Sequence, residues 1–142
     1  MDQASQKYEK PLPNMDPEDK PFWESVKEHR MKVQRCAECG SWCFQPKPFC
    51  PKCLSDKLEW TPVKGRGKVY ASTTIHHAFM PYWKGDVPFN LSIIELDEGV
   101  HMVSNVIGVP PQDVKIGMPV EVVYDDVTEE ITLHKFRPVA KG

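Results

Sequence analysis

The sequence predicts a mostly-β protein with one short helical segment near its N-terminus, and three observations support this prediction. Two Cys-x-x-Cys pairs, Cys36/Cys39 and Cys50/Cys53, lie close together in a chain of 142 residues. Five short runs rich in β-branched residues follow them, separated by turn residues. A single helix start precedes the cysteines, so only one helical segment is expected.

The helix start is the stretch Asp16-Pro17-Glu18-Asp19, which places an N-cap type of residue before a proline and two acids. Residues 1–15 are polar with two prolines, and we expect them to form a flexible arm. We predict helix from about Lys20 to His29, within a helical segment of residues 16–30. Its apolar side requires a partner, either the chain's own core or another subunit, and it carries Phe22, Trp23 and Val26.

Two strands are predicted on either side of the cysteines. Met31 and Val33 alternate with polar residues, as a strand with one buried face requires. A return strand that contains Trp60 is expected over residues 57–63. These strands bound a cysteine-rich unit of residues 31–63.

The second predicted unit, residues 64–142, has the pattern of a small barrel. It starts with a glycine-rich turn, and its predicted strands are residues 68–76, 91–96, 100–106, 119–124 and 131–136. The segment between the third and fourth strands is too short for more than one helical turn. Five strands with a small helical insertion after the third favour an OB-fold barrel, and a five-stranded SH3-like barrel is the alternative.

The cysteine spacing is typical of a metal site. Each Cys-x-x-Cys pair places two thiolates on one tight turn, and two facing turns form a tetrahedral pocket of four sulfur atoms. Gly40 suits the positive φ that follows such a turn, and Pro51 stiffens the second turn. We predict one structural zinc ion, bound by Cys36, Cys39, Cys50 and Cys53.

Three alternatives to a zinc site are open to these cysteines. Iron in a rubredoxin-like site would use the same ligands. Disulfides are disfavoured in a reducing compartment, and a thioredoxin-like redox motif expects a βαβ pattern that the sequence lacks.

The fifth cysteine, Cys43, lies between Trp42 and Phe44 and is predicted to be a packed free thiol. A zinc ion with four thiolate ligands has no open position at which to activate water. The predicted role of the metal is therefore to fold a segment too small to bury a core, and to hold a binding surface in place.

No group of residues forms a recognisable catalytic site. His76-His77 has no nucleophile motif or phosphate loop beside it, and the acids of residues 125–130 have the pattern of a solvated hairpin. We therefore predict that the chain is not catalytic by itself.

The loop from His77 to Phe89 is rich in large apolar residues, namely Phe79, Met80, Tyr82, Trp83 and Phe89. Aromatic residues in a loop between barrel strands can line a ligand mouth or fill a partner's pocket. They can equally cap the open end of the barrel.

Charge is distributed unevenly along the chain. The stretch from Lys27 to Lys68 holds ten Lys/Arg against four Asp/Glu, and the remainder holds eight against sixteen. The basic half indicates an anionic partner or charge complementarity within the fold. The chain has no apolar run long enough for a membrane span and no secretory signal, so we expect a cytoplasmic protein without a membrane partner.

The strongest indication of function comes from five stretches taken together with Trp60: KPFWESVKEHRMKVQRCAECG, FCPKC, GRGKVYASTTIHH, FNLSIIELDEGVHMVSNVIG and VKIGMPVEVVYDD. From about Asp16 to Val139 the chain resembles the acyl-CoA-associated zinc-ribbon/OB-fold proteins, known as domain of unknown function 35. The resemblance implies a helical segment, a rubredoxin-like zinc ribbon with the same four cysteine ligands, and a C-terminal OB-fold.

The resemblance also implies a partner. Members of this family look like accessory subunits of thiolase-superfamily enzymes, either acyl-CoA thiolases or thiolase-like aldolases in aromatic or steroid side-chain degradation. The expected assembly contains two copies of each chain, with the acyl-CoA at or near the interface. The partner would supply the catalytic groups, and this chain would stabilise it and help guide the acyl-CoA.

Contacts with the partner or ligand are expected at three sets of residues. Phe22 and Trp23 would face a partner, the basic side chains would meet CoA phosphates, and the aromatic loop would close over the acyl or pantetheine part. The basic set is Lys47, Lys64, Arg66 and Lys68, and the loop set is Phe79, Tyr82 and Trp83. Family members often have Pro-Pro-Arg where this chain has Gln45-Pro46-Lys47, and lysine lacks the bidentate fork of arginine.

A different class of function has the same overall composition. Single-stranded nucleic-acid binders also join a zinc ribbon to an OB-fold, and they combine a basic groove with stacking aromatic residues. The predicted barrel is net acidic, whereas a barrel that tracks a nucleic-acid strand should itself be basic. We therefore expect no nucleic-acid partner.

Overall fold

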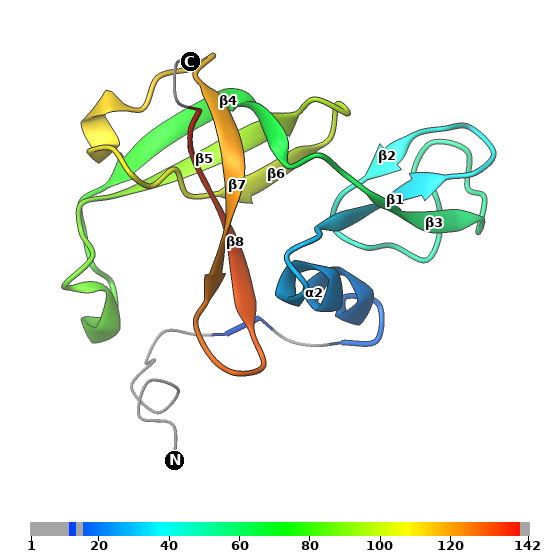
Figure 1. Cartoon of the computed structure of the whole chain (residues 1–142), viewed down its shortest axis with the longest axis horizontal. Coiled ribbons are helices and arrows are strands. Elements are labelled where there is room, and N and C mark those ends of the chain that lie inside the picture. The colour runs from blue at the N-terminus through cyan, green and yellow to red at the C-terminus, as the bar shows by residue number, and fades with distance from the viewer. Residues whose placement is uncertain (1–11, 14–15, 140–142) are drawn as a thin grey trace.

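The computed structural model describes residues 12–13 and 16–139, so nearly all of the predicted arm lies outside the described residues. Within these residues, one α-helix and two antiparallel sheets make up the fold. The smaller sheet lies at one end of an elongated molecule, the larger sheet at the other, and the helix beside their junction (Figure 1).

Helix α2 covers Lys20–Lys27, two residues less than predicted at its C-terminal end. It stops because His29 takes a positive φ of 61°, where its N–H donates to the carbonyl of Val26. Phe22 and Val26 are buried on one face, in the chain's own core. Of the two alternatives for the apolar face of the helix, the structure therefore supports packing against the chain's own core.

The smaller sheet has the order β2-β1-β3. Its strands are β1 Lys32–Cys36, β2 Trp42–Cys43 and β3 Leu58–Pro62. Gln34 at the centre of β1 pairs with Cys43 on one side and Trp60 on the other. Strand β2 was not predicted, because two residues are too few to show a periodic pattern.

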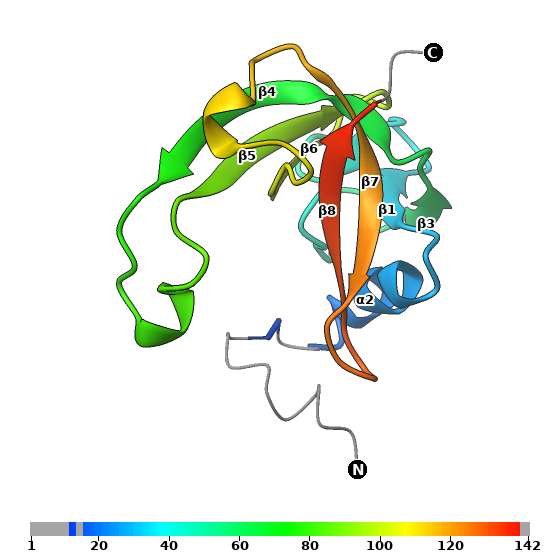
Figure 2. The ribbon, with the colours of Figure 1, turned by 60° about the vertical axis from the view of Figure 1, so that its left-hand side comes forward.

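The larger sheet has the order β6-β5-β4-β7-β8 and contains all five predicted strands. They are β4 Arg66–Ile75, β5 Phe89–Leu96, β6 His101–Ser104, β7 Pro119–Asp126 and β8 Thr132–Pro138. Figure 2 shows the sheet curled like half a barrel. A parallel bridge between Val106 and Phe136 brings its two edges together, in agreement with the predicted OB-fold.

Two short 3-10 helices lie in the connections of this sheet. One, η1 Pro81–Trp83, lies in the long β4–β5 loop. The other, η2 Pro111–Asp113, is the predicted helical insertion after the third strand. Glu98, in the β5–β6 turn, accepts the backbone N–H of Lys64 through its carboxylate and so holds the linker between the two sheets.

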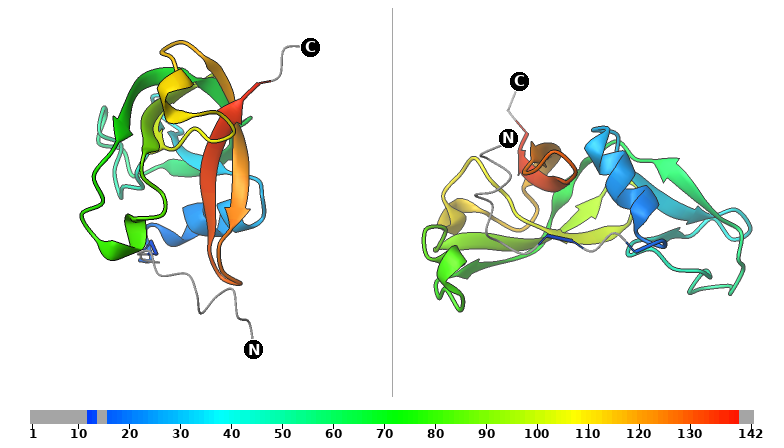
Figure 3. Two further views of the ribbon diagram at one scale, coloured as in Figure 1. Left: turned by 90° about the vertical axis from the view of Figure 1, so that its left-hand side faces the viewer. Right: turned by 90° about the horizontal axis from the view of Figure 1, so that it is seen from below.

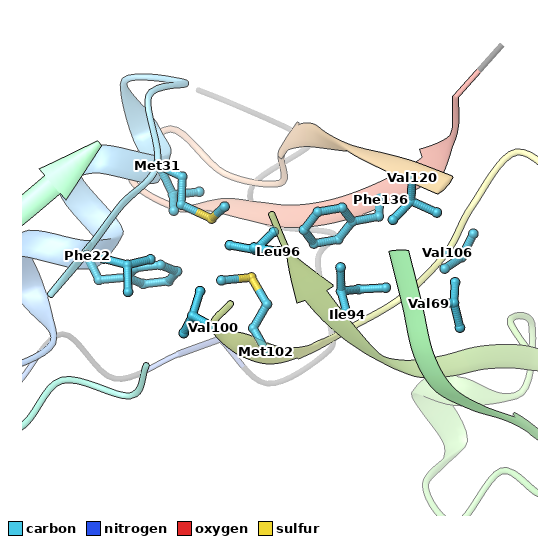
Figure 4. Packing of buried hydrophobic residues seen from close by; sticks show 12 residues of the cluster. Phe22, Met31, Val69, Ile94, Leu96, Val100, Met102, Val106, Val120 and Phe136 are labelled. Atoms are coloured by element: carbon cyan, nitrogen blue, oxygen red, sulfur yellow. The ribbon is translucent and has the colours of Figure 1, made fainter. Parts of the chain in front are cut away.

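The core is continuous between the helix and the larger sheet. In Figure 4 Phe22 and Met31 extend toward Val100 and Met102, and Phe136 lies beyond them. Val26, Met31 and Phe136 are fully buried. The Met31 N–H also donates to the Tyr124 hydroxyl at 2.9 Å, which fixes the entry to the smaller sheet against β7.

Seen from below, α2 lies between the β7–β8 hairpin and the smaller sheet (Figure 3). In the described part of the chain, no helix has the length and apolar character that a membrane crossing requires.

Candidate metal centre and binding surfaces

The structure brings the four predicted metal ligands together. The sulfur atoms of Cys36, Cys39, Cys50 and Cys53 all lie within 4.8 Å of one another. Cys36 and Cys53 are 3.5 Å apart, and Cys39 and Cys50 are 3.6 Å apart. Four ligands at the usual Zn–S distance of about 2.3 Å in a tetrahedron are separated by about 3.8 Å, so the cluster fits one zinc ion.

Two turns of the same design present these sulfurs. In the first knuckle, residues 36–40, the Gly40 N–H donates to the Cys36 carbonyl at 2.9 Å. In the second knuckle, residues 50–54, the Leu54 N–H donates to the Cys50 carbonyl at the same distance. Backbone N–H groups also point at a sulfur in each knuckle, from Cys39 in the first and Lys52 in the second. Such bonds orient metal-binding thiolates and favour their charged form.

A cation among the four sulfur atoms would stabilise their charged form. The Ser41 hydroxyl, 3.2 Å from the Cys39 sulfur, lowers the pKa of that thiol to about 6. The pKa of Cys53 instead rises to about 12, because the hydrogen bond with the Cys36 sulfur and burial outweigh the opposing backbone hydrogen bond with Ser55. Neighbouring thiols cannot all lose their protons without a positive charge between them. A bound zinc ion supplies that charge.

Cys43 is separate from this group. Its side chain is only 4% exposed and it does not belong to the four-cysteine cluster. Burial raises the pKa of its thiol, which keeps it neutral and unreactive. It packs in β2, as a small apolar residue would.

The predicted basic residues lie among carboxylates. Arg66 and Lys68 lie at the start of β4, and each is near an acid of a neighbouring strand. Arg66 lies 3.7 Å from Glu121, and Lys68 lies 3.5 Å from Glu95. Both basic side chains remain about three-fifths exposed. Exposed pairs of this kind contribute little and exchange readily, so an anionic ligand could still compete for these cations.

The aromatic loop divides into two parts. Trp83 stacks on Phe89, with ring centroids 5.2 Å apart, and both line a cavity of about 320 Å³ at the end of the larger sheet. Asn105 and Lys135 add polar groups to its wall. Phe79 instead is 83% exposed at the tip of the loop, packed only edge-on against His77. Within one loop, the structure therefore places residues that line a cavity and residues that project to the surface.

The predicted contact residues do not form one site. Lys68 lies near the start of β4, and Trp83 follows its end. Ile75 follows Lys68 by seven positions along β4, which corresponds to about 23 Å of extended strand. Lys47 lies in the smaller sheet's loop, where its backbone bonds to the Gln34 side chain. The helix residue Phe22 is 2% exposed and belongs to the core.

Sequence reasoning missed His134 altogether. Its imidazole lies among the rings of Phe22, Trp23 and Phe44, at the junction of helix, smaller sheet and β8. Both ring nitrogens are enclosed, and within the described residues neither makes a hydrogen bond of good geometry, although the ring lies near the backbone of Val103. Burial lowers the imidazole pKa to about 4. The alternating pattern of β8 can indicate that His134 points inward. It cannot show which aromatic residues surround His134, because they come from distant segments of the chain.

The acids around the β7–β8 turn are largely exposed, as predicted, and two of them also have partners within the chain. Asp125 forms an ion pair with Lys135 at 2.7 Å, and Asp126 accepts a hydrogen bond from the Thr132 hydroxyl. Asp126 also lies 3.0 Å from the His29 ring. The Thr132 hydrogen bond and the His29 contact lower the pKa of Asp126. These acids fix the hairpin against α2.

Comparison with known proteins now extends these observations. Residues 23–59 match the family described as "ChsH2, rubredoxin-like zinc ribbon domain", and residues 60–125 match "ChsH2, C-terminal OB-fold domain". A "DUF35 domain-containing scaffold protein" of Methanocaldococcus jannaschii is 36% identical over 82% of this chain and 88% of its own length. The predictions of a zinc ribbon and an OB-fold are thereby confirmed.

Other relatives carry enzyme names. A "Probable enoyl-CoA hydratase alpha subunit" of Thermomonospora curvata is 36% identical over 84% of this chain, which spans only 37% of that protein. The "Benzoylsuccinyl-CoA thiolase subunit BbsA" of Thauera aromatica is 28% identical over 56% of this chain and 54% of its own length. Among solved structures, a chain of the "Ltp2-ChsH2(DUF35) aldolase" superposes with a TM-score of 0.81 at 33% identity, covering 89% of this chain and 98% of that chain.

Proposed function

This chain belongs to the ChsH2-like family of DUF35 scaffold proteins, and from that premise we propose that it is the non-catalytic, zinc-binding accessory subunit of a thiolase-superfamily complex acting on acyl-CoA thioesters. The observation that carries the proposal is the likeness to the DUF35 chain of an aldolase complex, which spans nearly all of both chains.

The names of the relatives support the class of partner. A hydratase, a thiolase and an aldolase complex all contain a chain of this kind, and the first two are named for CoA thioesters. The chain spans about a third of the hydratase subunit, so the hydratase activity itself does not transfer to it. The names of these relatives share an enzyme built from more than one subunit, and we infer for this chain a separate catalytic partner, either a thiolase or a thiolase-like aldolase.

The chemistry of the described residues supports a non-catalytic role. The metal ligands are four cysteines, which leave the zinc ion no position for water or substrate. His29 contacts the carboxylate of Asp126, and His101 contacts that of Glu95. No Ser or Cys side chain joins either of these two pairs. A catalytic triad would need the imidazole to lie between a nucleophile and the carboxylate.

The ligand-facing surface would lie at the cavity end of the larger sheet. There Trp83 and Phe89 offer a stacked apolar wall, and the charged residues Asp86 and Lys135 lie at its edge, Lys135 paired with Asp125. The apolar wall suits an acyl or pantetheine chain. Arg66 and Lys68 lie near the other end of β4 and would meet phosphates only if a ligand follows the whole strand.

The first experiment is native purification of the chain from its own source, with mass identification of the proteins that co-elute. We expect an equal amount of a thiolase-superfamily protein, in a complex with two copies of each chain. Elution of the chain alone, or with nucleic acid, would contradict the accessory-subunit proposal.

The ligand contacts are tested on the purified complex. Replacing Trp83 by Ala should weaken acyl-CoA binding about tenfold, because it removes one face of the cavity. Replacing Phe79 by Ala is the matched control from the same loop. Reversing the charges of Arg66 and Lys68 to Glu tests the phosphate contact separately, and unchanged affinity would remove that contact from the proposal.

A further inference from the structure

The two zinc knuckles differ at one equivalent position. Gly40 and Leu54 follow the second cysteine of each pair, make the same hydrogen bond, and take φ values of 78° and 64°. This left-handed conformation is free of strain for glycine and unfavourable for leucine. The second knuckle therefore keeps a residue that its own backbone disfavours.

Nothing within the described residues compensates for this choice. The Leu54 side chain is 76% exposed. His29, also at positive φ, stacks on Tyr124 and contacts Asp126, while Gln45 is polar and exposed. Leu54 is the one apolar residue at positive φ in residues 12–13 and 16–139. Both its conformation and its exposure oppose the stability of the isolated chain.

A second exposed apolar residue lies at the other end of the knuckle. Phe49 directly precedes the knuckle and is 54% exposed. The Cys50 N–H donates to the Ser55 carbonyl at 2.8 Å, which ties the two ends of the knuckle together. Pro48, Pro51 and the metal ligands restrict this backbone further. Leu54 and Phe49 are thus held on a rigid support, which lowers the entropic cost of binding.

The charges around these residues indicate what could cover them. Lys47 and Lys52 are exposed, and neither has an ion-pair partner in the part of the chain that the structure describes. Lys57 is paired with Glu38 of the first knuckle. The lysines can offset the negative charge of four thiolates around one zinc ion, but that role explains neither Leu54 nor Phe49. An apolar pair with unpaired cations at its rim is complementary to an apolar pocket with a carboxylate rim.

We propose that the second knuckle is a docking tip, defined as Phe49, Lys52 and Leu54, that inserts its two apolar side chains into a carboxylate-rimmed apolar pocket on the catalytic subunit. The identity of the occupant rests on the proposed function. The tip lies in the connection between β2 and β3, and the smaller sheet lies at the opposite end of the molecule from the β4–β5 loop (Figure 1). It therefore adds an attachment point that is independent of the ligand.

The test uses the full chain and the subunit that co-purifies with it in equal amount. Leu54→Ala removes the apolar side chain and keeps the left-handed conformation, and Lys52→Glu reverses the rim charge. The matched controls are Ile116→Ala and Lys115→Glu, from an exposed loop of the larger sheet where Ile116 is 73% exposed. Each variant is first checked for one zinc ion per chain, and its Kd for the subunit is then measured at two salt concentrations.

We expect Leu54→Ala to raise Kd about ten- to thirty-fold, since it removes a buried leucine from the interface. Lys52→Glu should also raise Kd, with the difference shrinking at high salt. The control variants should bind like the wild type.

Three results would overturn the inference. Equal binding by all variants would exclude the tip from the interface while leaving the accessory role intact. Self-association of the chain that Leu54→Ala abolishes would assign the tip to a second copy. Failure of the wild-type chain itself to bind the subunit would remove the proposed function as well.

Discussion

The smaller and the larger sheet are neighbours in one molecule, yet they are stabilised by different interactions. The larger sheet contributes a row of inward residues from every strand to a common core, including Ile94, Leu96 and Phe136. The strands of the smaller sheet contribute Val33 to that core, with Trp42 and Trp60 packed against it, and this sheet with its loops presents the four sulfur atoms of the metal site. Burial alone holds the larger sheet, whereas the smaller sheet also depends on metal coordination, so loss of the metal should disturb mainly the smaller sheet.

The largest expected effect comes from removing a metal ligand. Cys36→Ser should abolish zinc binding, and residues 32–62 should then lose their structure, because a structural zinc site supplies about 10–16 kcal/mol to folding. Hydrogen exchange followed by mass spectrometry should show lost protection in that segment and retained protection in residues 66–138. Cys43→Ser is the control and should still bind one zinc ion. Equal loss of protection in both sheets would show that they fold as one unit.

The converse change concerns the core of the larger sheet. Phe136 is fully buried and lies at the bridge that joins the sheet's edges. Phe136→Ala should lower the free energy of unfolding by about 3–5 kcal/mol, as expected for a large aromatic residue in a core. Zinc content should stay at one ion per chain, measured on the same sample. A variant that loses its zinc would contradict the division between the two regions.

The junction between the regions should respond to pH. Burial lowers the pKa of His134 to about 4, so the folded chain holds this imidazole neutral while the unfolded chain protonates it near its ordinary value of about 6.5. The unfolded state binds more protons in this window. Stability should therefore fall as the pH drops from about 6.5 to about 4, by as much as about 3 kcal/mol.

His134→Phe keeps an aromatic ring in place and removes the titration. Denaturant unfolding between pH 7 and pH 4.5 should then depend on pH less steeply than in the wild type. Acid release of zinc and the titration of Asp126 occur in both proteins, so the comparison between them cancels these effects. Identical slopes would mean that His134 is solvated in the folded state.

The smallest expected effects compare the two knuckles. Leu54→Gly should raise the stability of the zinc-bound chain by about 1 kcal/mol, because it relieves the left-handed backbone. Gly40→Ala should lower it by a similar amount, since its added Cβ meets only the Arg35 guanidinium, at 3.9 Å, and the cost is therefore conformational. Chelator competition reports on this region. A loss of stability in Leu54→Gly would show that the leucine contributes a contact within the chain.

Much of this fold is local in the sequence and was predictable. The cysteine spacing determined the metal ligands, because two sulfur atoms three positions apart on a tight turn can reach one ion whatever surrounds them. The strands of the larger sheet followed from their alternation, and the insertion of residues 111–113 from its length and prolines.

Features that depend on cross-strand register could not be predicted. The pairing of Lys68 with Glu95, and of Arg66 with Glu121, depends on which residues lie opposite each other in β4, β5 and β7. The separation of Lys68 from Trp83 follows from the length of β4, which the sequence pattern indicated only to within a few residues. The enclosure of His134 depends on three segments that meet only in the folded chain.

The position of α2 has a consequence for partner choice. Phe22 and Met31 join the helix and the entry of the smaller sheet to the core of the larger one, so the two sheets cannot turn independently without exposing that core. The second knuckle and the β4–β5 loop lie at opposite ends of the molecule, and both present exposed apolar residues (Figure 3). A protein that accepts both ends must offer two receiving sites at a matching distance. Because the span between the two ends is rigid, it would favour proteins whose two sites are separated by that distance over proteins that can bind only one end.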